Sequence, residues 1–165
     1  MAELDRYPVH RRTILTAILG GLFADRLAAA APCRPTRVLF VCPVGTVKSA
    51  IARETLRRRV AASNLPVLVQ SRGIAPANHV TPALAERLHA DAIDPTVDPL
   101  RALTAADVAN ADIVIAFDEA AQSPLLAKAR AWRTPSWNDQ YDAAKADLAQ
   151  RLDGLIEELA RTPAC

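Results

Sequence analysis

Apolar and polar positions along the chain alternate in blocks that match strands and helices in turn. Two short runs, 38–41 and 113–117, are apolar at every position. Runs of this length with no polar side are typical of parallel strands that helices cover on both faces. Two less continuous runs at 67–70 and 132–134 predict shorter strands. The chain is therefore expected to contain a parallel sheet.

The longer segments between these runs carry apolar residues at helical spacing. In the last of them, the leucines between Leu148 and Leu159 recur every three or four positions. Thr81-Pro82 is a helix start signal, with Thr81 as N-cap and proline at the first helical position. Helices are predicted at 49–62, after Thr81, at 104–109, at 119–130 and at 142–160. Because strands and helices alternate, we expect an α/β fold: a three-layer, doubly wound, four-stranded parallel sheet with helices on both faces.

A cysteine, Cys42, ends the first predicted strand. Open α/β sheets bind ligands at the carboxyl ends of their strands. A short loop that contains Gly45 separates Cys42 from the helix expected to start near Ser49. The amide N–H groups of such a loop and helix start favour a thiolate and a bound oxyanion. The alternative is that Cys42 is a small buried side chain of the core.

The segment from Cys42 through Lys48 to Ser49 resembles the anion loop of the low-molecular-weight protein tyrosine phosphatases and of the arsenate reductases that share their fold. Ser71-Arg72-Gly73 is similar to a second loop of this family, and the strand 113–117 with Asp118 resembles its third strand. The resemblance extends from about Arg37 to Leu159. It implies a domain over 32–165 that hydrolyses a phosphate monoester of the phosphotyrosine type through a phosphocysteine intermediate at Cys42.

The resemblance also implies the residues that bind phosphate. The sulfur of Cys42 is the nucleophile, Ser49 can hydrogen-bond the thiolate or act as an ordinary N-cap, and the loop supplies amides. The implied phosphate-binding positions are Val44, Gly45, Thr46, Val47, Lys48 and Ser49. Lys48 stands where the family has arginine, which replaces a planar two-pronged donor by a point charge. Pro43 lacks an N–H group, and Val44 occupies a position where the family usually has glycine.

The proton donor for the leaving group is implied less directly. The family carries it in an Asp-Pro pair after the last short strand, and Ser136 occupies the expected slot here. Asp139, three residues further, is the predicted substitute. Trp137 and Tyr141 are predicted to wall the cleft around an aryl phosphate, or else to pack on the surface.

Composition narrows the function further. The 165 residues, 51% of them hydrophobic, suffice for one domain with a real core. The net charge of +2 and the lone basic triplet Arg57-Arg58-Arg59 do not predict a nucleic-acid surface. The three histidines show no metal-ligand spacing, and the glycines form no dinucleotide motif. We expect no metal and no cofactor, and the resemblance implies a phosphate monoester or a phosphorylated protein as partner.

The first 31 residues differ from the rest of the chain. Arg11-Arg12 precedes an apolar run at 13–23, and small residues follow at 28–31. This pattern resembles a twin-arginine export leader. The apolar run is too short for a stable membrane span. Residues 1–31 are therefore expected to be a removed leader of a periplasmic protein, or an N-terminal helix of a cytoplasmic one.

Two other functions stay open at this stage. A loop in which both the arginine and the acid are altered is what a phosphate-binding or phosphoprotein-binding pseudophosphatase with weak catalysis would carry. A thiol-dependent arsenate reductase needs a second cysteine, and Cys165 is the candidate. Cys33 lies across the first strand from Cys42, too far for a disulfide.

Overall fold

A four-stranded parallel sheet forms the centre of the computed structural model, which describes residues 34–161. Its strands are β1 (Thr36–Cys42), β2 (Val67–Gly73), β3 (Ile113–Phe117) and β4 (Arg130–Trp132), in the order β2-β1-β3-β4. All three strand pairs are parallel. The predicted fold class is confirmed. The predictions for residues 1–31, Cys33 and Cys165 lie outside the described residues.

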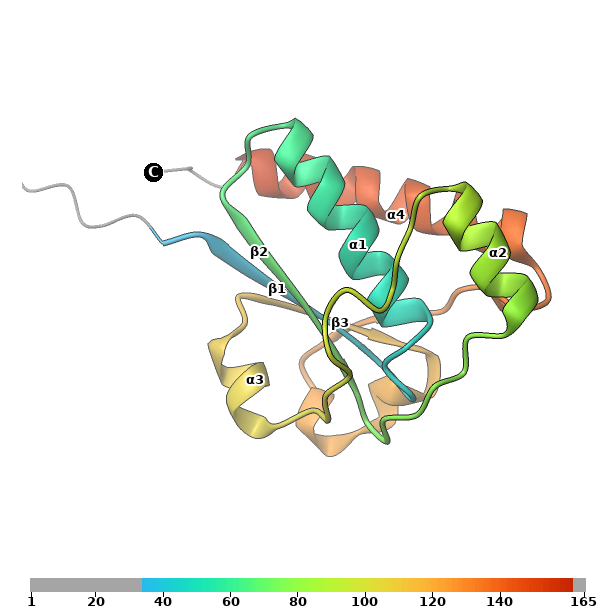
Figure 1. Cartoon of the computed structure of the whole chain (residues 1–165). Helices are drawn as coiled ribbons and strands as arrows, with labels where there is room; N and C mark the ends of the chain where they lie inside the picture. The colour runs from blue at the N-terminus through green and yellow to red at the C-terminus, as the bar shows by residue number, and fades with distance from the viewer. Residues whose placement is uncertain (1–33, 162–165) are drawn as a thin grey trace, which may run out of the picture. The chain divides into compact units, whose positions relative to one another are not determined.

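Helices cover both faces of this sheet (Figure 1). One face carries α1 (Lys48–Ala62), α2 (Pro82–Ala90) and α4 (Tyr141–Arg161). The other face carries α3 (Ala105–Asn110) and two short 3-10 helices, η1 (Asp118–Gln122) and η2 (Pro124–Leu126). Among the described residues, no helix is both long enough and apolar enough to cross a membrane.

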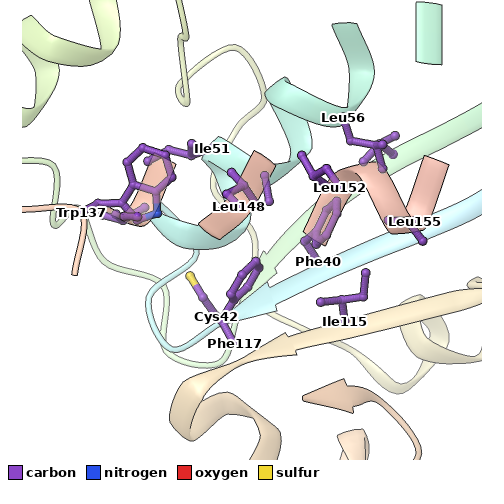
Figure 2. Packing of buried hydrophobic residues seen from close by; sticks show 14 of the residues in the cluster. Phe40, Cys42, Ile51, Leu56, Ile115, Phe117, Trp137, Leu148, Leu152 and Leu155 are labelled. Atoms are coloured by element: carbon purple, nitrogen blue, oxygen red, sulfur yellow. The ribbon is translucent and has the colours of Figure 1, made fainter. Parts of the chain in front are cut away.

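Side chains of β1 alternate between two buried clusters. Phe40 and Cys42 point into the larger cluster with α1 and α4, whereas Leu39 and Val41 belong to the smaller one with η1 and η2. This explains why the strand is apolar at every position, since both of its faces are covered. Figure 2 shows Cys42 at the end of β1 beside Phe117, within the larger cluster. Cys42 therefore lies on the face of the sheet that α1 covers.

Side chains cap the starts of α2 and α3, and the predicted N-cap Thr81 is confirmed. Thr81 accepts a hydrogen bond from the Leu84 amide at the start of α2. Thr104 and Asp107 form a reciprocal capping box at the start of α3, which satisfies two amides that have no partner within the helix. These two caps fix the starts of α2 and α3.

The predicted helix at 119–130 is wrong. The structure has η1 and η2 there, and β4 begins at Arg130, two residues before the expected strand. Pro124 has no N–H group to continue a helical ladder, so the chain turns at Ser123 and starts again. The segment also begins at Asp118 with a φ of 50°, which is not a helical angle.

The edge strand β2 is longer than predicted and ends at Gly73. Leu68 on this strand is half exposed. The carbonyl oxygen of Val69 accepts two hydrogen bonds from the Arg57 guanidinium, at 3.2 Å from Nε and 2.9 Å from Nη2. Arg57 therefore does more than end a helix, because it covers a backbone acceptor of the edge.

Candidate functional site

The sulfur of Cys42 is held by two neighbours. The Gly45 amide donates to it at 3.1 Å, and the Ser49 hydroxyl oxygen lies 3.1 Å away. The hydroxyl is also 3.4 Å from the Arg72 carbonyl oxygen. Cys42 is 1% exposed. The sulfur of Cys42 therefore has two polar neighbours, one backbone amide and one hydroxyl.

Ser49 does not act as an N-cap. Lys48 is the first residue of α1, Val47 is the N-cap, and no side chain caps the helix. Ser49 is therefore inside the first turn with its hydroxyl free to face Cys42. This geometry favours the first of the two predicted roles for Ser49, the contact with the sulfur.

The loop between Cys42 and α1 packs so closely against its surroundings that Gly45 has no room for a side chain. Gly45 has a φ of 80°, and a Cβ at this position would lie 2.7 Å from Leu100 Cδ1 and 2.9 Å from the Gly73 nitrogen. Only glycine fits both the angle and the space. The Thr46 hydroxyl donates to the Ala77 carbonyl oxygen at 2.8 Å, which anchors the other half of the loop.

Several amides of this loop have no acceptor. Within 34–161, no hydrogen-bond acceptor contacts the amides of Val44, Thr46 or Val47, and the first turn of α1 adds the orphan N–H groups of a helix start. The positive end of the helix dipole lies at the same place. The loop can therefore receive an oxyanion next to the cysteine sulfur.

The side chain of Lys48 is turned toward β3 and β4. Its ammonium group forms an ion pair with Asp118 and donates to the Thr134 carbonyl oxygen at 2.8 Å. The two side chains of the pair are 19% and 20% exposed. The second oxygen of Asp118 accepts from the Thr134 amide at 3.3 Å. Lys48, Asp118 and Thr134 thus form one connected group.

Thr134 also carries a polar atom without a partner. Its hydroxyl Oγ1 is buried and is the unpartnered buried side-chain oxygen or nitrogen of the described residues. Because β4 ends at Trp132, the first Xaa-Pro pair after the strand is Thr134-Pro135. Ser136 comes after that pair. In the structure, a threonine stands in the pair where the resemblance leads one to expect an aspartate.

A pocket of about 190 Å³ opens over this group. Cys42, Lys48 and Asp118 line it together with Val44, Val47 and Trp137, and His79, Ser136 and Asn138 complete much of its wall. Gly45 and Thr46 line a neighbouring pocket of about 240 Å³ instead. The structure therefore brings together the cysteine, the lysine and one of the two predicted aromatic walls.

Two predicted site residues lie away from this pocket. Asp139 is exposed and accepts a hydrogen bond from Ser136 Oγ at 2.6 Å. Tyr141 is 4% exposed and packs edge-on against Trp137, with ring centroids 5.3 Å apart. Its hydroxyl donates to Asp91. Burial, together with this hydrogen bond, raises the pKa of Tyr141. Tyr141 therefore packs against Trp137 and does not line the pocket.

Sequence reasoning missed Asp118 as a member of the site. Asp118 marked the end of the third strand in the resemblance, but its pairing with Lys48 joins residues 70 positions apart. One signal was available: a carboxylate at the carboxyl end of the strand next to β1 lies at the edge where ligands bind. Within the described residues, no group of three histidines, cysteines or acidic residues is placed to hold a metal ion.

Comparisons with known proteins agree with this geometry. The family described as low molecular weight phosphotyrosine protein phosphatase matches residues 37–163. A search of the curated proteins finds no match. Among solved structures, a low molecular weight protein tyrosine phosphatase from Bacillus subtilis is similar, with a TM-score of 0.60, 20% identity, and coverage of 77% of this chain and 99% of that one.

Two further solved structures have the same fold. An arginine phosphatase, YwlE from Geobacillus stearothermophilus, matches with a TM-score of 0.60 and 21% identity over 76% of this chain and 94% of its own. A thioredoxin-dependent arsenate reductase from Corynebacterium glutamicum matches with a TM-score of 0.62 and 20% identity over 82% of this chain and 67% of its own.

Proposed function

Because the chain belongs to the low molecular weight phosphotyrosine protein phosphatase family, we propose that it hydrolyses a phosphate monoester through a phosphocysteine intermediate at Cys42. The observation that carries the proposal is the sulfur of Cys42, which lines a pocket, accepts from the Gly45 amide and faces the Ser49 hydroxyl at the start of α1. A thiolate so placed is a nucleophile beside an anion site.

The reaction has two displacement steps. In the first, the Cys42 thiolate attacks phosphorus, an S–P bond forms, and the P–O bond to the leaving group breaks while that oxygen takes a proton. In the second, water attacks phosphorus, the S–P bond breaks, and inorganic phosphate leaves with the thiolate restored. The unpaired amides of the loop and of the first turn of α1, together with one N–H group of Lys48, stabilise the phosphoryl oxygens. Trp137 forms an apolar wall for an aryl group.

The proton donor in this proposal is Asp139. It is one hydrogen bond from Ser136, whose side chain belongs to the pocket wall. Only poor leaving groups need a proton in the transition state. Asp139→Asn should therefore slow phenyl phosphate hydrolysis more than nitrophenyl phosphate hydrolysis. Equal losses on the two esters would assign Asp139 a structural part instead.

The test of the main proposal is turnover of an aryl phosphate by the purified chain. Wild type should release phosphate and give a burst of labelled protein that acid traps as an S-phosphate, and Cys42→Ser should abolish both. Cys165→Ser is the matched control, since a thiol-dependent arsenate reductase would need a second cysteine and a phosphatase would not. Turnover that survives Cys42→Ser would overturn the proposal.

A second candidate function is phosphate or phosphoprotein binding without turnover. The observation that favours it is the group of Lys48, Asp118 and Thr134, in which the loop cation is already paired and the Xaa-Pro pair lacks a carboxylate. Its signature is saturable binding of phosphate that protects Cys42 from iodoacetamide, with no phosphate release from any ester.

We also propose that residues 1–31 are an export leader that is removed from a periplasmic protein. The supporting features are Arg11-Arg12, the apolar run 13–23 and the alanines at 28–31. The mature protein should then begin near Ala31 or Pro32 in a mass spectrum of the native protein. A start at Met1 or Ala2 in the cytosolic fraction would contradict export.

A further inference from the structure

We propose that Asp118 sets the charge preference of the Cys42 pocket, so that the pocket selects singly charged tetrahedral anions over doubly charged ones. The inference rests on the proposed function in one respect, namely that the ligand is an oxyanion ester. It names the class of ligand: esters with one ionised oxygen on the tetrahedral centre, which for a phosphate monoester is the monoanion that predominates below the second ionisation at about pH 6.

The first step concerns the donors of Lys48. An ammonium group has three N–H donors and no acceptor. Two of them are committed, one to Asp118 Oδ2 and one to the Thr134 carbonyl oxygen. One N–H remains for an anion at the loop. An arginine at this place would have offered a planar pair of donors.

The second step is the charge of the pocket. Of the described residues that line it, Lys48 is the one lysine or arginine and Asp118 the one acidic residue. Their charges cancel, and a Cys42 thiolate adds a negative charge. An anion therefore meets backbone dipoles and one lysine N–H, but no net positive side-chain charge. Asp118 therefore offsets the attraction that Lys48 would otherwise exert on each negative charge of the anion.

The third step is that the Asp118 carboxylate is held in place at the pocket. Both of its carboxylate oxygens are used, one by Lys48 and one by the Thr134 amide. Its backbone has a φ of 50° at the junction of β3 and η1, an angle uncommon for residues other than glycine. The side chain is about four-fifths buried. Its negative charge is therefore a fixed part of the pocket.

The experiment compares two aromatic anions of similar shape that the protein cannot hydrolyse. At about pH 9, well above the second ionisation of a phosphoryl group at about 6, phenylphosphonate carries two charges and benzenesulfonate one. Each is titrated into the full chain with tryptophan fluorescence as the signal, because Trp137, one of the two tryptophans, lies in the pocket wall. The measured quantity is the ratio of the two dissociation constants.

Wild type should bind benzenesulfonate at least as tightly as phenylphosphonate. Asp118→Asn should shift the ratio toward phenylphosphonate by about tenfold or more, because it removes a like charge next to the anion. Asp118→Glu keeps the charge and should keep the wild-type ratio. Glu119→Gln is the matched control, since it removes one exposed carboxylate outside the pocket, and its ratio should equal that of wild type.

Three results would overturn the inference: a wild-type preference for phenylphosphonate of tenfold or more, an unchanged ratio in Asp118→Asn, or no binding of either anion. A purely structural role for Asp118 would weaken both anions equally and so leave the ratio unchanged. Hydrolysis of an aryl phosphate is measured separately. Its absence would end the hydrolase proposal while the ratio still tests Asp118.

Discussion

Lys48 is the residue at which this chain departs most from the anion loop that it resembles. Arginine has more N–H donors than lysine, and its planar fork can present a second charge-assisted hydrogen bond to a phosphoryl oxygen, worth about 1.5–3 kcal/mol. Lys48→Arg should therefore raise kcat/KM for an aryl phosphate by about 10- to 150-fold.

Steady-state kinetics of wild type and Lys48→Arg check this expectation. A brisk wild type that Lys48→Arg slows would mean that lysine suits a different anion, and the tyrosine phosphatase assignment would fall. Two inert proteins that both bind phosphate would favour the binding function.

Arg53 is a buried charge with a structural part. It is 2% exposed, and its guanidinium donates to Glu54 at 2.7 Å, to Ser71 Oγ at 2.8 Å and to the Pro95 carbonyl oxygen at 2.9 Å. Removing one member of such a group leaves buried polar atoms unpaired, at a cost of about 3–5 kcal/mol.

Arg53→Met should accordingly lower the free energy of unfolding by about 3 kcal/mol or more, measured from urea denaturation midpoints. Arg58→Met is the control on the same helix. Arg58 is exposed and makes one long contact, 3.4 Å to the Asp91 carbonyl oxygen, so its replacement should stay within about 0.5 kcal/mol of wild type. Equal effects of the two variants would contradict the assignment.

The sequence was informative at this scale where function depends on neighbours along the chain. Cys42 and Ser49 are seven positions apart, and a strand end followed by a helix start predicts their approach. Asp118 and Thr134 are joined to Lys48 only by the order of the strands, which no local pattern encodes. For the same reason Tyr141, whose hydroxyl contacts α2, was expected in the cleft and lies behind it.

Among the elements, the anion loop requires glycine at Gly45, whereas α4 has room for a side chain at Gly154. Gly45→Ala places a Cβ against Leu100 and the Gly73 backbone at a φ of 80°, so it should destabilise the protein by about 1–3 kcal/mol. Gly154 lies within α4, where a Cβ would meet nothing within 4 Å. Gly154→Ala should stabilise by about 0.5–1 kcal/mol.

Thermal or urea unfolding of both variants measures the sign of each change in the free energy of unfolding. Gly45→Ala should in addition weaken the protection that phosphate gives Cys42 against alkylation, whereas Gly154→Ala should leave that protection unchanged. A stabilised Gly45→Ala would show that the loop is less confined than its contacts indicate.

The elements themselves were predictable to different degrees. Thr81 and Thr104 marked helix starts because caps are local in sequence. The helix expected at 119–130 failed although its residues have good helix propensity, because one proline at 124 and the turn at Asp118 decide the backbone. Propensity summed over a segment does not register a single missing N–H group.

For the molecule as a whole, several carboxylates bind arginine and so link stability to pH. The hydrogen bond from Arg57 lowers the pKa of Asp98 from 3.8, and the hydrogen bond from Arg34 lowers that of Asp112. A carboxyl with a lowered folded pKa contributes stability that is complete above its unfolded value and is lost as pH falls through the folded value.

The free energy of unfolding should therefore be flat between about pH 7 and pH 5 and fall below about pH 4. Asp98→Asn should lower stability at neutral pH and make the acid loss shallower. Urea titrations at several pH values measure both. An acid slope that Asp98→Asn leaves unchanged would assign the loss to other carboxylates.

The hydrogen bonds from the Arg57 guanidinium to the Val69 carbonyl oxygen affect how copies of this protein associate. An uncovered edge strand with a half-exposed Leu68 offers a template on which a second chain can add a strand. Arg57 occupies one acceptor of that template with a charged group. Arg57, which lies outside the pocket, therefore helps to protect the edge of β2 against pairing with a second chain.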